Sequence, residues 1–128
     1  MRLPMLLGAM AITCLWAGAA WSSETAGTVV RIAKLVIDPA QLTAYRKAVT
    51  EEMEDSVRLE PGVLAINCVA EKGHPNRLHF FEVYADDAAY RSHIASPHFQ
   101  KYLATTRTMI LSKELLETEP VQLSAKTK

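Results

Sequence analysis

The pattern of hydrophobic and polar residues begins clearly at residues 29–37, with the sequence VVRIAKLVI. This run is rich in β-branched side chains and places Arg31 and Lys34 among apolar neighbours. Such a pattern is typical of a strand whose two faces are both largely covered. We therefore predict the first strand of the domain here.

A helical pattern follows the strand directly. Asp38 supplies a capping carboxylate, Pro39 suits the first helical position and Gln41 is placed to complete a capping box. Apolar residues then recur at spacings of three and four: Leu42, Tyr45, Val49, Met53 and Val57. Acidic residues fall mostly on the opposite side, where we interpret them as a solvated face: Glu51, Glu52, Glu54 and Asp55. The pattern predicts an amphipathic helix that ends before Pro61-Gly62.

The second half of the chain alternates between strand and helix signals. Residues 63–71 and 77–84 are β-prone, and the Gly, Pro and Asn of residues 72–76 predict a hairpin turn between them. Asp86 can cap a short helix through Ile94, and Ser96-Pro97 can start another with Phe99, Leu103 and Ile110 on its buried stripe. Residues 115–123 contain Pro120 and are predicted to form an edge strand or one exchanged with a partner.

The order strand, helix, strand, strand, helix, strand predicts an α+β fold of the ferredoxin-like type, with helices on one face of an antiparallel sheet. The first strand also has apolar residues on both of its faces. We therefore expect a second subunit to cover the other sheet face, giving a homodimer.

The N-terminal segment predicts export. Arg2 precedes an apolar stretch, residues 3–16, and small residues follow at 17–20, the layout of a secretory signal. We expect cleavage after Ala19, Ala20 or Ser22, and divide the chain into a signal peptide (1–22), a leader (23–27), a domain (28–123) and a polar tail (124–128). The mature protein would be periplasmic or secreted, with no membrane attachment after cleavage; an uncleaved anchor is the alternative.

Charge and cysteine content narrow the possible functions. The whole chain has 14 basic and 14 acidic residues, and removal of Arg2 leaves 13 and 14, a net charge of about −1. This balance does not favour nucleic acid as a partner. Cys68 would be the single cysteine after cleavage, so no intrachain disulfide is expected, and we interpret it as a small buried hydrophobe.

His93 is the first candidate for chemistry. It shares a predicted helical face with Ala89, Tyr90 and Ile94 and should point toward the sheet. A buried imidazole near a carboxylate can have its pKa set close to working pH and act as a base. The alternative is a core histidine whose ring is satisfied by a backbone carbonyl.

Other polar residues are candidates for the same site. Glu82 and Tyr84 share one face of a strand and can orient His93 or bind a substrate oxygen; alternatively Glu82 forms an ion pair with Arg31, Arg77 or Arg107. His98 lies in a first helical turn, where the helix dipole favours a neutral ring, or it simply fixes the helix junction. Asn67 can present an amide to a pocket or exit at a strand edge.

Motifs for several kinds of metal, redox and nucleotide sites are missing from the sequence. The chain contains no CxxC, HExxH, P-loop or GxGxxG motif and no His and carboxylate cluster with metal spacing. We therefore predict neither a metal nor another cofactor.

Two segments carry a resemblance to a known family. Pro61-Gly62-Val63-Leu64 and residues 77–99 (RLHFFEVYADDAAYRSHIASPHF) resemble the antibiotic biosynthesis monooxygenases, and the likeness runs from about Val29 to Leu123. The family-like pattern HxxSxHF matches at His93, Ser96, His98 and Phe99. The resemblance implies a dimeric α/β barrel.

The resemblance also implies oxidation of a hydroquinone or phenolic aromatic by dioxygen, without metal or flavin. His93 would take a phenolic proton, Tyr84 with Glu82 or His98 would hold the developing oxyanion, and apolar walls would come from Phe81, Tyr90 or Phe99. Haem-degrading relatives share the fold but use an Asn, a Trp and a His at places that here hold Ala33, Tyr84 and Leu103, so haem cleavage is not expected.

Two other functional classes stay open on the sequence. One is a non-catalytic dimer that binds a small apolar ligand or another protein. The other is an isomerase or signal-degrading enzyme on the same scaffold, in which His93 moves a proton without consuming dioxygen.

Overall fold

The computed structural model of the chain describes residues 27–126. The predicted signal peptide, all of the leader except Gly27, and the last two residues of the tail lie outside this range. Among residues 27–126, no helix is both long enough and apolar enough to cross a membrane.

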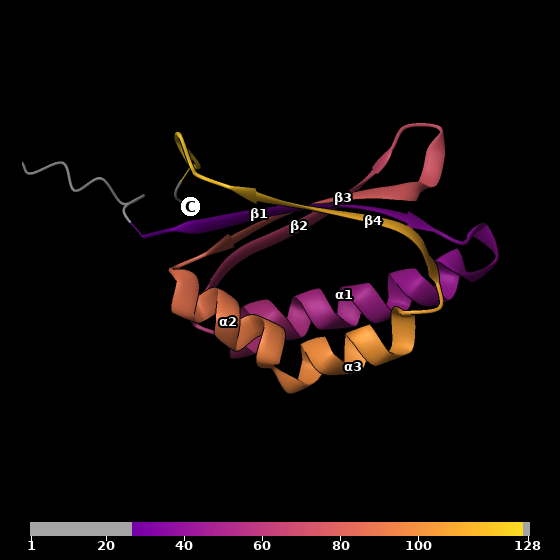
Figure 1. The fold of residues 1–128 in the computed structure, drawn as a ribbon, viewed down its shortest axis with the longest axis horizontal. Coiled ribbons are helices and arrows are strands. Elements are labelled where there is room, and N and C mark those ends of the chain that lie inside the picture. The colour runs from indigo at the N-terminus through magenta and orange to yellow at the C-terminus, as the bar shows by residue number, and fades with distance from the viewer. Residues whose placement is uncertain (1–26, 127–128) are drawn as a thin grey trace, which may run out of the picture.

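Four strands and three α-helices make up the domain: β1 (Val29–Ile37), α1 (Leu42–Leu59), β2 (Val63–Glu71), β3 (His74–Tyr84), α2 (Asp87–Ala95), α3 (Pro97–Thr106) and β4 (Ile110–Thr118). The strands form one antiparallel sheet in the order β2-β3-β1-β4. All three helices lie against the same face of the sheet (Figure 1). The predicted α+β, ferredoxin-like arrangement is therefore confirmed.

The start of the first helix shows how the sequence sets the local structure. Asp38 Oδ1 accepts a hydrogen bond from the backbone N–H of Ala40 at 2.9 Å, and Gln41 Nε2 donates to Asp38 Oδ2 at 3.2 Å. These bonds hold one turn of 3₁₀-helix (Pro39–Gln41) before α1 begins. The predicted cap at Asp38 is correct, but the capping box is not formed, because the backbone N–H of Asp38 donates to Met109 and not to Gln41. The α-helix proper starts three residues later than Pro39.

The core lies between α1 and the helix-facing side of the sheet. Its buried members are Ala33, Leu35, Ile37, Tyr45, Val49, Leu78 and Phe80. One part of the prediction for α1 is wrong: Glu52 does not lie on the solvated face but is buried, and Val57 is half exposed. The buried stripe of α1 is Tyr45, Val49, Glu52 and Ser56, which keeps the helical spacing but rotates it toward the acidic side.

Two strand boundaries differ from the sequence prediction. β3 begins at His74, so the hairpin turn is shorter than predicted and is made by Lys72 and Gly73, whose φ of +82° suits glycine. β4 spans Ile110–Thr118 instead of residues 115–123, because α3 ends at Thr106 and Ile110 pairs with Ile37 of β1. β4 is an edge strand, as predicted, and it pairs with β1 of its own chain.

The turn between α1 and β2 brings the chain close to α2. An added Cβ on Gly62 would lie 2.5 Å from the Cβ of Ala89. Only a glycine allows this approach, which seats the end of α1 against α2.

Candidate active site

A cavity of about 170 Å³ lies between the sheet and the helices. Its charged and titratable lining residues are Arg31, Glu52, Glu82, Tyr90, His93, Tyr102, Lys113 and Glu117. Its remaining walls are mainly apolar and aromatic, with Phe80, Phe99 and Leu103 among them. A small apolar space with a few converging polar groups is the usual form of a ligand site.

His93 is held at one side of this cavity by α2. Asp86 caps that helix by accepting from the N–H of Ala89 at 2.7 Å, and the last turn carries His93. The side chain is only 3% exposed. Its ring lies 4.8 Å from that of Phe99 and 5.3 Å from that of Tyr84, measured between ring centroids. The predicted orientation toward the sheet is therefore confirmed.

Two carboxyl groups flank the imidazole of His93: that of Glu52, within α1, and that of Glu60, the residue that follows α1. Nδ1 lies 2.9 Å from Oε2 of Glu60, within hydrogen-bonding distance, while Nε2 lies 3.6 Å from Oε1 of Glu52. Because a carboxylate only accepts, the Glu60 contact places a hydrogen on Nδ1 and leaves the lone pair of the neutral ring on Nε2. The partner of His93 is a side-chain carboxylate and not the backbone carbonyl of the simpler interpretation.

Glu60 also holds the second histidine of the motif. His98 Nε2 lies 2.7 Å from the same Oε2 atom of Glu60. Ser96 makes this possible, because it ends α2 and its Oγ accepts from the N–H of Phe99 to begin α3. The two rings thus approach one carboxylate from two different helices.

Glu52 is a buried carboxyl, although the acidic run around it in the sequence favours a place on the surface. Its Oε1 accepts from Ser56 Oγ at 2.7 Å. Burial raises the pKa of Glu52, although the Ser56 hydrogen bond and the neighbouring His93 each oppose the shift. This carboxyl can therefore hold a proton at higher pH than an exposed glutamate.

Glu82 and Tyr84 of β3 make a separate pair. The Tyr84 hydroxyl donates to Glu82 Oε2 at 2.7 Å, and burial raises the pKa of both groups. Within residues 27–126, Glu82 forms no ion pair with any of the three arginines considered from the sequence. Glu82 lines the cavity, while Tyr84 is fully buried behind it.

The remaining sequence candidates divide between the two faces of the sheet. Tyr90 and Phe99 line the cavity as predicted. Phe81 and Asn67 pair with each other on the opposite, exposed face, so neither contributes to the cavity. His98 lies beside Glu60 and borders another hollow, between α1 and α3.

Three residues of the site have the donor set of a metal centre. One ligand atom from each of Glu52, His93 and His98 can be chosen so that all three lie within 4.8 Å of one another. Two nitrogens and one oxygen are suitable ligands for zinc or iron. In this structure, Glu60 takes one ring nitrogen of each histidine by hydrogen bonding.

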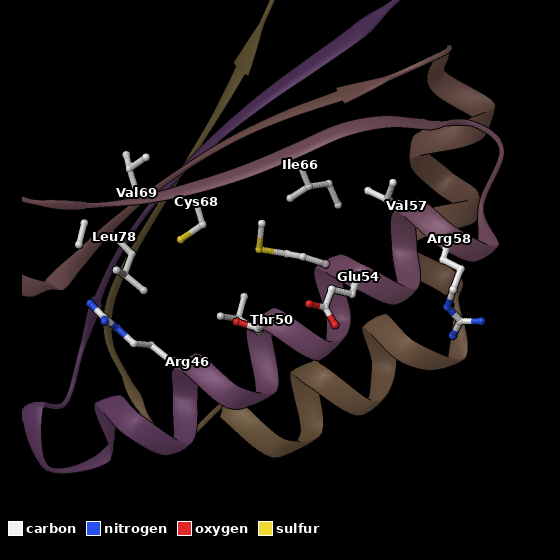
Figure 2. A pocket seen from close by; sticks show the side chains of 12 residues that line it. Arg46, Thr50, Glu54, Val57, Arg58, Ile66, Cys68, Val69 and Leu78 are labelled. Atoms are coloured by element: carbon white, nitrogen blue, oxygen red, sulfur yellow. The ribbon is translucent and has the colours of Figure 1, made fainter. Parts of the chain in front are cut away.

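A larger hollow, of about 760 Å³, lies between α1 and the edge strand β2. Figure 2 shows Ile66 and Cys68 directed from β2 toward α1, with Thr50 and Glu54 facing them. Burial raises the pKa of the Cys68 thiol to about 11, so it stays protonated at neutral pH and is a poor nucleophile. The lining of this larger hollow includes no histidine and no buried carboxyl. The smaller cavity is therefore the better candidate for catalysis.

Comparison with known proteins places this site in a family. The family model for antibiotic biosynthesis monooxygenases, abbreviated ABM, matches residues 28–105. This chain belongs to the ABM family. No curated protein matches the sequence significantly.

Solved structures support the ABM assignment. A candidate antibiotic biosynthesis monooxygenase from Bacteroides thetaiotaomicron is 45% identical, with a TM-score of 0.77 over 81% of this chain and 99% of that one. A candidate monooxygenase from Lactobacillus acidophilus is 32% identical, with a TM-score of 0.68 over 70% of this chain and 42% of that one. A protein from Mycobacterium tuberculosis, 21% identical, shares the fold with a TM-score of 0.70 over 77% and 99%.

Proposed function

We propose that this ABM protein is an exported, cofactor-independent monooxygenase that oxidises a hydroquinone or phenolic aromatic with dioxygen. The observation that carries the proposal is the buried His93, whose Nδ1 is held by Glu60 and whose Nε2 remains available beside an aromatic-lined cavity. The names of the related structures support a monooxygenase role in general. A phenolic substrate suits this site because a single buried base can activate it by removing its hydroxyl proton.

In this mechanism, His93 Nε2 takes the proton of a ring hydroxyl. The resulting phenolate gives one electron to dioxygen, and the ring radical and superoxide combine through a new carbon–oxygen bond. The protonated His93 returns its proton to the peroxide. The oxygen–oxygen bond of this hydroperoxide then breaks. Its outer OH leaves as water together with the hydrogen on the ring carbon that carries the peroxide, and that carbon becomes a carbonyl. A hydroquinone and one dioxygen thus give a hydroxyquinone and one water.

Glu60 and Glu52 have distinct parts in this proposal. The Glu60 carboxylate fixes the tautomer of His93 and stabilises the imidazolium that forms after proton transfer. Glu52, whose pKa is raised by burial, lies 3.6 Å from Nε2 and would take the transferred proton when the two atoms come within hydrogen-bonding distance. The hydrophobic lining keeps bulk water away from the radical pair.

Dioxygen uptake by the mature protein tests the function directly. The protein is treated with EDTA, separated from the chelator and mixed with a panel of hydroquinones. We expect uptake above the buffer blank, one hydroxyquinone for each dioxygen, and the same rate before and after EDTA. The EDTA step is required because Glu52, His93 and His98 have the spacing of a metal centre. Activity lost on chelation and restored by a metal would contradict cofactor independence; no uptake with any compound would favour the isomerase or binding alternatives.

We also propose that a second copy of the chain covers the sheet face opposite the helices. That face carries the half-buried Ile32, Val36 and Val83, and Phe81 is 40% exposed. Sheet-on-sheet packing would remove this apolar surface from water. Sedimentation velocity is expected to give the mass of two chains. Phe81→Lys should shift it to the mass of one chain, while Val121→Lys, at an exposed position after β4, should not. A single-chain mass for the unaltered protein contradicts the dimer.

A further inference from the structure

Two side chains of β4 lie at opposite ends of the cavity beside His93. Glu117 pairs in register with Arg31, and Lys113 pairs with Leu35, four residues farther along β1. Both Glu117 and Lys113 line the cavity, and four residues of strand separate their Cα atoms by about 13 Å. The cavity therefore extends along the strand from an acidic residue to a basic one.

The proposed base lies at the Glu117 end. Arg31 pairs with Glu82 of β3, whose carboxyl accepts from the hydroxyl of Tyr84. The ring of His93 lies 5.3 Å from that of Tyr84, measured between centroids. The two carboxyl groups in register with Arg31 leave no excess of positive charge at this end, even when the Glu82 carboxyl is protonated. This end therefore suits a neutral hydroxyl better than an anion.

Lys113 provides the positive charge at the other end. It is exposed, so a ligand can reach its ammonium group, and among residues 27–126 it forms no ion pair. Leu103 and Ile110 line both the cavity and an adjoining hollow, as Lys113 itself does, and Arg107 adds a second cation to that hollow. A cation without a counterion thus lies among apolar side chains at the mouth of the cavity.

An anionic group on the ligand would complete this arrangement. A carboxylate beside Lys113 gains an ion pair without breaking one that already exists, and the apolar neighbours reduce the screening of that pair by water. The lysine side chain covers part of the distance of about 13 Å along the strand. An aromatic ring with one substituent at each end can cover the rest.

We propose that Lys113 binds the carboxylate of an aromatic acid, a phenol or hydroquinone whose ring carries its anionic group on the side away from the hydroxyl that His93 deprotonates. The ring enters the cavity hydroxyl first, because Glu52 and Glu82 near the base would repel a carboxylate. The phenolic ring rests on the proposed function, whereas recognition of the carboxylate needs no reaction.

Anaerobic calorimetry with a matched pair of ligands tests this role. The pair is (2,5-dihydroxyphenyl)acetate, an anion at neutral pH, and its uncharged methyl ester. For the unaltered protein we expect the acid to bind about fivefold more tightly than the ester, the most that one exposed ion pair usually contributes. The difference should shrink as NaCl is raised to about 0.5 M, because salt screens exposed charges.

Three variants assign the preference to one residue. Lys113→Met should lower the affinity for the acid by about fivefold and leave that for the ester unchanged. Lys113→Arg keeps the charge and should keep the preference. Lys72→Met is the matched control, since it removes the same charge from the turn between β2 and β3, where it lines neither the cavity nor the hollow. It should bind both ligands as the unaltered protein does.

The inference is overturned if the unaltered protein binds the acid no better than the ester, or if Lys113→Met keeps the full preference. An equal loss of acid and ester binding in that variant also contradicts it, because Lys113 would then only shape the mouth. A protein that prefers the acid through Lys113 but never consumes dioxygen refutes the monooxygenase proposal alone. Dioxygen uptake with neutral hydroquinones, together with no preference for the acid, refutes the carboxylate site alone.

Discussion

Replacing His93 with alanine is expected to lower the dioxygen-dependent rate by roughly 10²- to 10⁴-fold, the range typical of a lost general base. The loss should be in kcat, because the aromatic lining that binds the ring is unchanged. Stopped-flow oxidation of the best hydroquinone from the uptake panel measures both constants. Added imidazole should restore part of the rate, since the deleted ring leaves a space of its own size beside the cavity.

Two controls accompany the His93 variant. His79→Ala removes a histidine from the other sheet face, where it contacts Glu71, and is expected to keep the wild-type rate. His93→Gln keeps much of the side-chain volume and so separates loss of the base from loss of packing. A folded His93→Ala protein with wild-type kcat would remove His93 from the mechanism.

Glu60→Gln is expected to cause the second largest effect, a fall in kcat of about 100-fold with little change in KM. The carboxylate accepts hydrogen bonds from His93 Nδ1 and His98 Nε2, and a glutamine there would bring an N–H donor and no charge. A donor facing Nδ1 favours the other tautomer, with the hydrogen on Nε2, and that tautomer cannot take a proton from substrate. Glu60 is therefore a positioning residue that acts through His93.

The pH profile distinguishes this role from a purely structural one. Removing the carboxylate removes a negative charge that favours proton uptake by the neighbouring ring, so the acidic limb of the kcat profile should move to lower pH. Glu54→Gln, at an exposed residue of α1 in the larger hollow and away from His93, is the matched control and should leave rate and profile unchanged. A Glu60→Gln protein with the wild-type profile and rate would show that Glu60 does not tune the base.

Local signals predicted most elements of this fold. The caps at Asp38, Asp86 and Ser96 are visible in sequence because each satisfies backbone N–H groups within three residues. The last strand was misplaced because Ile110 fits a helical stripe as well as a strand. Only its pairing with Ile37, far away in the sequence, decides between them.

The site was predicted in part, for a related reason. His93 was found because its helical face is apolar, and the family-like motif added His98. Both partner carboxylates were missed. Glu52 lies within an acidic run that resembles a solvated face, and Glu60 lies beside a turn. Glu52 lies three residues after Val49, and this helical spacing predicts that the two share the buried face. The adjacent acidic residues favour the opposite prediction of a solvated face. Contacts across 33 and 38 residues, from Glu60 to the two histidines, leave no local pattern.

The joint at Ser96 decides whether the two histidines can act together. On one uninterrupted α-helix, residues five positions apart point about 140° away from each other, at roughly 100° for each residue. His93 and His98 would then diverge, and no single carboxylate could receive both. The serine and the proline after it therefore belong to the site as much as the rings do, although neither touches the cavity. A sequence search for similar centres should require the interruption between the histidines, because the two histidines at this spacing without it describe a different geometry.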